Sequence, residues 1–161
     1  MSGEIFKREV TTSPELESKR YSYIGIFGAT GSGKSELGRL INSAWGTRVF
    51  EEDYPENEFL EKFYLKDPKS WSLKSQLFFA TSKIEQMQAI RPLLSRGMLW
   101  HDPALEADRD IYAYVQHQMG FMSPEEYLLY QLGVETKMQV LELPKPDLFF
   151  AVDASDEAVC Q

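Results

Sequence analysis

Residues 25–35 read GIFGATGSGKS, and they follow an apolar run that begins at Tyr21. Within this stretch, residues 28–35 match the pattern G-x-x-x-x-G-K-[S/T] at every defined position. Glycines let successive backbone N–H groups turn toward an anion, and a helix that follows them points its positive end at the same place. Because the pattern lies between a strand-like and a helix-like segment, it predicts a phosphate-binding loop.

The loop predicts a nucleotide triphosphate as its ligand. In such loops the lysine, here Lys34, reaches the outer phosphates, and the following hydroxyl, here Ser35, ligates Mg²⁺. The loop alone does not separate kinases from GTPases, ATPases or inactive nucleotide binders. The chain contains no Asn-Lys-x-Asp segment, which disfavours a GTPase, and its small size and helix-rich middle favour a small-molecule kinase. The residues expected to bind ATP are Gly28, Ala29, Thr30, Gly31, Ser32, Gly33, Lys34 and Ser35.

Strand-like and helix-like segments alternate along the chain. This order predicts an α/β fold of the P-loop NTPase type, with a parallel sheet wrapped by helices. We expect residues 1–20 to form a flexible tail and residues 21–161 to form one kinase-like domain. Nine residues follow the last expected strand, so we expect a fold truncated at its carboxyl end. The expected strands are 21–27, 47–50, 98–100 and 147–152, and the expected helices are 34–45, 56–65, 69–95, 104–119 and 124–141.

Composition excludes several classes of function. The formal net charge is −8, with 17 basic and 25 acidic residues, so binding to a nucleic-acid polymer is disfavoured by charge repulsion. No apolar run has the length of a membrane span, and no apolar signal core begins the chain, so we expect a cytoplasmic protein without membrane contact. The single cysteine, Cys160, excludes an internal disulfide. His101 and His117 form no recognised metal-binding pattern.

Several separated motifs follow the loop, in the order FEEDYPENEFLEKFY (50–64), Asp67-Pro68, Trp71, QLFF (76–79), DRDIY (108–112), MSPEE (122–126) and PDL (146–148). These motifs resemble those of the deoxyribonucleoside kinase family, because they occur in the family's order and at nearly its spacing, over a region from about residue 22 to the carboxyl terminus. The resemblance implies ATP and Mg²⁺ as cofactors, a small nucleoside as substrate, and a homodimer formed through helices that flank the sheet.

The resemblance also implies a role for individual residues. Glu52 corresponds to the carboxylate that accepts the proton of the sugar 5′-hydroxyl, a step that needs a well-placed base; the neighbouring Glu51 remains an alternative. Gln76 corresponds to the glutamine that makes paired hydrogen bonds to the nucleobase, and Asp108 to an acidic residue that helps to select it. The remaining positions are Tyr64, which would contact the sugar 3′-hydroxyl, and Leu60, Phe63 and Tyr112, which would form the apolar walls.

The chain departs from the family pattern near the reaction centre. Asp102 matches an acidic residue that assists Mg²⁺, but the arginine and serine that follow it in the family are Pro103 and Ala104 here. A second family arginine aligns with Lys83, which is expected among the substrate-binding residues; the lysine keeps the positive charge but lacks the planar guanidinium group that can make two parallel hydrogen bonds. Arg109 falls on a family arginine and is expected to be available for catalysis. Family members also continue into an arginine-bearing lid, which has no counterpart before Gln161.

These observations predict an enzyme that transfers the γ-phosphoryl group of ATP to the 5′-hydroxyl of a deoxynucleoside or nucleoside. A nucleotide-binding accessory protein or inactive kinase-like protein is the first alternative, favoured by Pro103 and the missing lid. A nucleoside monophosphate kinase is the second alternative. It would require additional basic residues near the acceptor, which the sequence does not obviously provide.

Overall fold

Four parallel strands form the centre of the structure, a computed structural model that describes residues 22–52 and 55–153. The order across the sheet is β2-β3-β1-β4, and all three neighbouring pairs are parallel. The parallel sheet expected from the sequence is therefore confirmed, whereas the expected tail at residues 1–20 lies outside the described residues. The strands are β1 (Tyr23–Gly28), β2 (Arg48–Glu51), β3 (Leu99–Asp102) and β4 (Leu148–Val152).

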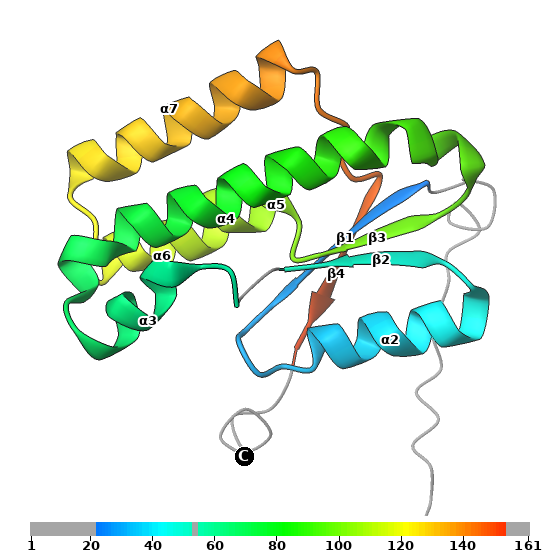
Figure 1. Cartoon of the computed structure of the whole chain (residues 1–161), viewed down its shortest axis with the longest axis horizontal. Coiled ribbons are helices and arrows are strands. Elements are labelled where there is room, and N and C mark those ends of the chain that lie inside the picture. The colour runs from blue at the N-terminus through cyan, green and yellow to red at the C-terminus, as the bar shows by residue number, and fades with distance from the viewer. Residues whose placement is uncertain (1–21, 53–54, 154–161) are drawn as a thin grey trace, which may run out of the picture.

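Helices connect the strands and cover both faces of the sheet (Figure 1). Their bounds lie close to those expected, with two differences. The expected helix 69–95 ends at Ile90 and continues as a 3₁₀ turn, because Pro92 cannot donate the next helical hydrogen bond. The expected helix 104–119 contains a wide π-helical turn at its centre. The helices are α2 (Lys34–Trp45), α3 (Glu58–Leu65), α4 (Pro68–Ile90), η1 (Arg91–Arg96), α5 (Leu105–Ala107), η2 (Asp108–Tyr112), α6 (Ala113–Gln118) and α7 (Pro124–Val140).

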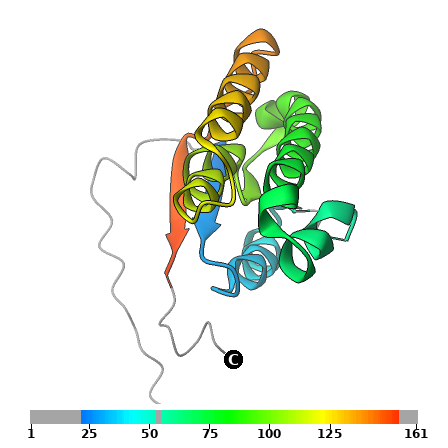
Figure 2. The same ribbon diagram turned by 90° about the vertical axis from the view of Figure 1, so that its left-hand side faces the viewer.

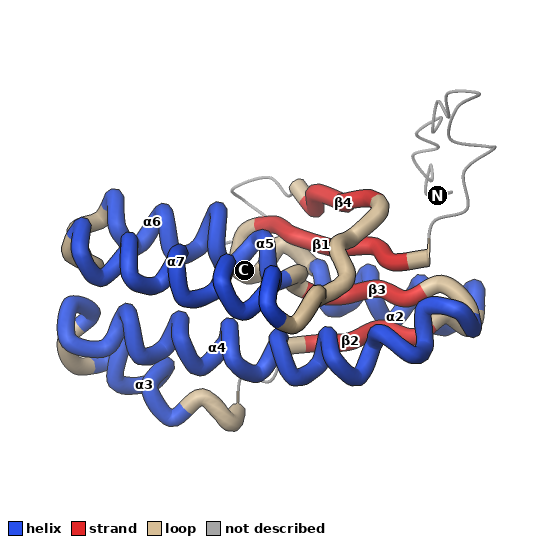
Figure 3. The backbone as a smooth tube through the Cα atoms, turned by 90° about the horizontal axis from the view of Figure 1, so that it is seen from above, coloured by secondary structure: helices blue, strands red, loops and turns tan. Residues whose placement is uncertain are grey.

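The core has two halves, one on each face of the sheet. Side chains alternate between the faces of a strand, so Tyr23 packs in the cluster that includes α4 and α7, whereas Ile24 and Ile26 pack with Ile41 of α2. Figures 1 and 2 show α2 and α7 on opposite sides of the strands. Seen from above, α4, α6 and α7 run side by side (Figure 3). The result is a three-layer arrangement in which the sheet lies between two layers of helices.

Asp147 ties the start of β4 to the start of β1. Its Oδ2 accepts hydrogen bonds from the backbone N–H groups of Ser22 (2.8 Å) and Tyr23 (3.0 Å). The Asp147 N–H in turn donates to the Tyr23 carbonyl, at 2.7 Å. This residue belongs to the PDL motif, so the motif has a structural role in setting the register of the two strands.

Met87 lies in the α4 half of the core and is fully buried. Met87→Ala is expected to lower the free energy of unfolding by about 2–5 kcal/mol, because it removes buried apolar atoms and leaves a cavity. The neighbouring Gln88 is exposed, and Gln88→Ala should change the free energy by less than about 0.5 kcal/mol. Urea unfolding followed by circular dichroism measures both. Equal effects of the two substitutions would contradict this packing.

Candidate active site

The phosphate-binding loop joins the end of β1 to the start of α2, as expected. Gly28 lies against β4, where an added Cβ would be 2.3 Å from the carbonyl oxygen of Val152, so a larger residue does not fit. Gly33 has φ of 90°, a left-handed conformation that favours glycine, and it directly precedes α2. The loop therefore ends at the amino end of a twelve-residue helix, where backbone N–H groups favour an anion.

Lys34 is folded back into the loop. It is 6% exposed, and its Nζ donates to the carbonyl oxygen of Ala29 at 2.8 Å. Burial lowers the pKa of Lys34, and the carboxylates of Asp102 and Glu52 act in the opposite direction. These two acids, from the ends of two further strands, thus lie close enough to the loop lysine to influence its charge.

Ser35, the last residue of the loop pattern, and Asp102, the last residue of β3, are hydrogen-bonded to each other. The Ser35 hydroxyl donates to Asp102 Oδ2 at 3.2 Å, whereas the buried Oδ1 of Asp102 has no partner within the described ranges. Burial raises the pKa of Asp102, and the Lys34 ammonium and the Ser35 hydroxyl lower it. Mg²⁺ takes one or two protein oxygens and completes its shell with phosphates and water. The pair fits that ion, although residues 22–52 and 55–153 contain no group of three or more acidic, histidine or cysteine ligands.

Lys83 of α4 lies between two carboxylates. Its Nζ is 2.6 Å from Glu52 Oε1 and also forms an ion pair with Asp108 of η2. Lys83 and Asp108 are each 1% exposed. Burial raises the pKa of Asp108 to about 6, the Lys83 ammonium lowers it, and the charge of Glu52 raises it. The structure thus joins the expected base to the expected nucleobase-selecting acid through one buried cation.

A chain of hydrogen bonds supports the strand end that carries Glu52. The Gln86 amide donates to the carbonyl oxygen of Glu51 at 3.2 Å, and Gln86 Oε1 contacts His101 Nε2 at 3.0 Å. His101 Nδ1 lies 2.7 Å from the Tyr23 hydroxyl. Burial lowers the pKa of His101 to about 3, so its ring is neutral at pH 7. Sequence reasoning missed Gln86, for which the one available signal was its position one helical turn after Lys83.

The residues expected to bind the nucleoside come from α3, α4 and η2. Gln76 is 5% exposed, and its Oε1 has no hydrogen-bond partner in the described part of the chain. Tyr64 is 66% exposed, and Leu60 is half-buried. Phe63 is buried and packs edge-on against Phe121, with ring centroids 5.8 Å apart. The sugar and base contacts of these residues remain predictions.

Tyr112 and Arg109 differ from their expected arrangements. The Tyr112 hydroxyl donates to the carbonyl oxygen of Gly28 at 2.7 Å, so this residue anchors the phosphate loop as well as offering an apolar ring. Arg109 is not free: its guanidinium is bound by the carboxylates of Asp110 and Glu135. A catalytic role of Arg109 stays a prediction that requires those ion pairs to open. Pro103, at the position of the missing family arginine, is buried. The cation that pairs with Glu52 is Lys83.

Comparison with known proteins identifies the family of the chain. The family model for deoxynucleoside kinases matches residues 24–161. The chain belongs to the deoxynucleoside kinase family. A deoxyadenosine/deoxycytidine kinase of Bacillus subtilis (strain 168) is 27% identical over 138 residues, and a deoxyguanosine kinase of the same organism is 28% identical over 134 residues. These matches cover 86% and 83% of the chain, but only 62% and 61% of the relatives.

Solved structures of the family share the fold. A deoxyadenosine kinase from M. mycoides, with dCMP and a flexible dCDP bound, aligns with a TM-score of 0.71 and 25% identity. The same kinase with bound dATP aligns with a TM-score of 0.70 and 25% identity. Each comparison covers 86% of this chain and 67% of the other. The deoxynucleoside kinase fold is therefore present from β1 to β4.

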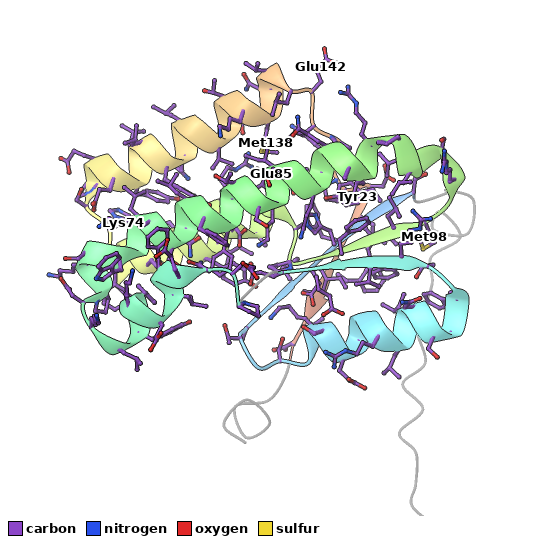
Figure 4. The ribbon with its side chains drawn as sticks, viewed as in Figure 1. Tyr23, Lys74, Glu85, Met98, Met138 and Glu142 are labelled. Atoms are coloured by element: carbon purple, nitrogen blue, oxygen red, sulfur yellow. The ribbon has the colours of Figure 1, made fainter. Side chains whose placement is uncertain are left out.

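Replacing the buried cation should change the ionisation of Asp108 in this family member. The Lys83 ammonium lowers the Asp108 pKa against burial, so Lys83→Met should move it above about 6. ¹³C NMR titration of the side-chain carboxyls measures the shift. Lys74 lies on the same helix, exposed (Figure 4), and Lys74→Met should leave the Asp108 pKa unchanged.

The sign of the accompanying stability change follows from linkage. The Asp108 pKa is raised from 3.8 to about 6 in the folded chain, so its contribution to stability is complete at low pH and is lost as the pH rises through about 6. In Lys83→Met, this loss of stability should continue to higher pH, because the Asp108 pKa should be higher in that variant. An unchanged Asp108 pKa in this variant would contradict the ion pair.

Proposed function

We propose that this protein transfers the γ-phosphoryl group of ATP to the 5′-hydroxyl of a deoxynucleoside. The observation that supports this most strongly is the joining of Glu52 and Asp108 by Lys83, beside the phosphate loop. Nucleotide-binding loops are common to many enzymes, but an adjoining acid fixed for proton transfer indicates an alcohol as the acceptor. The activity of family members with nucleosides supports the same acceptor.

ATP would lie with its phosphates on the loop. The backbone N–H groups from Gly28 to Ser35 and the Lys34 ammonium would bind the β- and γ-phosphates once Lys34 releases the Ala29 carbonyl. Ser35 and Asp102 would hold Mg²⁺, because one Asp102 oxygen is buried and has no partner among the described residues. The ion would neutralise the charge that the phosphate oxygens carry.

The nucleoside would lie between Glu52 and Gln76. Gln76 has an unpartnered buried oxygen, and Asp108 of η2 pairs with Lys83 of the helix that carries Gln76, so an amide and a carboxyl group would both face the base. Leu60, Phe63 and Tyr64 of α3 would contact the sugar and the base from the opposite side.

Glu52 would act as the base of the reaction. Its Oε1 is held by Lys83, and its Oε2 makes no hydrogen bond to the described residues. Oε2 would therefore take the proton of the 5′-hydroxyl while the 5′-oxygen bonds to the γ-phosphorus. The bond from that phosphorus to the β–γ bridging oxygen breaks, which releases ADP.

A nucleotide-binding protein with weak or no transfer is the second candidate. Lys83 already pairs with Glu52, and Pro103 stands where the family has an arginine, so one positive charge near the γ-phosphate is absent at that position. The two candidates make different predictions: the first requires a monophosphate product, and the second requires ATP binding without product.

Glu52→Gln tests the role of the base, and Glu51→Gln is its matched control. With Mg-ATP and a panel of deoxynucleosides, the wild type should form a 5′-monophosphate, detected by ³¹P NMR. Glu52→Gln should lower kcat by about 10²- to 10⁴-fold, because a glutamine cannot accept the proton. Glu51 is exposed and contributes its backbone carbonyl to Gln86, so Glu51→Gln should retain activity.

The outcomes separate the candidates. Loss of activity in Glu51→Gln with retention of activity in Glu52→Gln would show that the base is Glu51 and that the assignment to Glu52 is wrong. ATP binding with no product from any nucleoside would reject the kinase proposal for this chain in favour of the nucleotide-binding protein.

We also propose a homodimer formed through α6 and α7, and a cytoplasmic location. No helix of the described ranges is long and apolar enough to cross a membrane. The dimer is supported by large apolar side chains that are exposed to solvent, namely Tyr114 and Val115 of α6, Met119 directly after α6, and Leu128, Leu129 and Leu132 of α7. Burying them against a second copy would remove apolar surface from water.

Leu129 is 66% exposed on α7. Leu129→Glu should shift the protein toward monomer in analytical ultracentrifugation, because it places a charge in the apolar contact. Leu40 of α2, 59% exposed on the other side of the sheet, provides the control: Leu40→Glu should leave the sedimentation unchanged. A wild-type monomer at all concentrations would contradict the dimer.

A further inference from the structure

A cavity of about 440 Å³ lies at the end of the sheet opposite to the phosphate loop. Arg48 and Leu99 begin β2 and β3 there and are register partners, whereas the loop follows the carboxyl end of β1. Met98, one of the lining residues, marks this end in Figure 4. We name it the amino-end cavity; its lining consists of Trp45, Gly46, Thr47, Arg48, Leu93, Arg96, Gly97, Met98 and Leu99.

The charge of the amino-end cavity is opposite to that of the protein. Arg48 and Arg96 are exposed, and neither has an ion-pair partner among residues 22–52 and 55–153. None of the lining residues is acidic, although the chain carries 25 acidic and 17 basic residues. The carboxyl ends of α2 and η1 each bring at most about half a negative charge. Two full guanidinium charges outweigh them, so the cavity favours an anion.

Other side chains of the cavity could contact a planar apolar ring of a ligand and donate a hydrogen bond to a ligand oxygen. The Trp45 side chain is 67% exposed and touches Trp100 at a ring-centroid distance of 6.4 Å, which leaves most of the indole open to solvent. Thr47 Oγ1 is buried and has no hydrogen-bond partner in the described part of the chain. Leu93 and Met98 add apolar surface. An unsatisfied buried hydroxyl is unfavourable, and a ligand oxygen would satisfy it.

We propose that the amino-end cavity binds a nucleoside monophosphate, at a site separate from the phosphate loop. The phosphate would be bound by Arg48 and Arg96, whose planar forks match phosphate oxygens. The Thr47 hydroxyl would donate to the ligand, and the base would stack on Trp45. The volume lies within the range of about 300–1,000 Å³ that is typical of small-molecule sites. This site does not depend on the activity proposed above.

NMR of the indole N–H groups tests the site, with dAMP as the probe. The chain has three tryptophans, Trp45, Trp71 and Trp100, and Trp45→Phe assigns the signal of Trp45. Titration of the full chain with dAMP should shift that signal saturably. In the double variant Arg48→Gln/Arg96→Gln, the dissociation constant should rise about tenfold or more, because two charge-assisted contacts are lost.

Arg39 is an exposed arginine of α2 that pairs with Glu36 outside the cavity, so Arg39→Gln is the control and should leave the dissociation constant unchanged. A Trp45 signal that dAMP does not shift, or that shifts equally in the double variant, would overturn the proposal. Inorganic phosphate alone and deoxyadenosine alone form the remaining arms. A response to phosphate as strong as that to dAMP would show a bare anion site and would overturn the assignment to a nucleotide, as would an equal response to deoxyadenosine.

Discussion

The ammonium of Lys83, buried between Glu52 and Asp108, is the interaction on which the candidate active site depends. Moving an ion out of water costs several kcal/mol, and the loss of one partner of a buried pair destabilises a protein by about 3–5 kcal/mol. The buried ammonium of Lys83, in a residue that is 1% exposed, therefore depends on both carboxylates to offset the loss of its hydration. The interaction holds α4, the end of β2 and η2 in one arrangement. Glu52, the proposed base, and Asp108, which we propose to help select the nucleobase, thus share one cation.

The parallel sheet brings the phosphate loop to the same place. Because the carboxyl ends of parallel strands meet at one edge, the loop after β1 lies beside Asp102 of β3 and Glu52 after β2. The backbone of β2 is further supported by Gln86, which links the Glu51 carbonyl to the neutral ring of His101. Tyr112, from the π-helical turn, bonds to the Gly28 carbonyl. Wide helical turns of this kind recur at functional sites, and here one turn supplies both Asp108 and Tyr112.

Local signals predicted much of the fold, and contacts distant in the sequence account for most of what they missed in the site. The bounds of α2, Lys34–Trp45, are those expected, because a phosphate-loop pattern precedes the helix and Gly46 ends it in a left-handed conformation. The parallel sheet followed from the alternation of segments. The helix expected over 69–95 is longer than α4 for a local reason, because Pro92 lacks the N–H that a further helical turn requires. The pairing of Lys83 with Glu52 joins residues 31 positions apart, and the binding of Arg109 by Glu135 joins residues 26 apart; neither partner can be identified from spacing alone.

A double-mutant cycle on Glu52 and Lys83 tests the central claim most directly. Free energies of unfolding at pH 7 are measured for the wild type, Glu52→Gln, Lys83→Met and the double variant. If Lys83 binds Glu52 as the structure shows, the effects of the two substitutions will not add, and the coupling energy will be about 1 kcal/mol or more. Additive effects, with a coupling energy near zero, would contradict the shared cation and the active-site arrangement built on it.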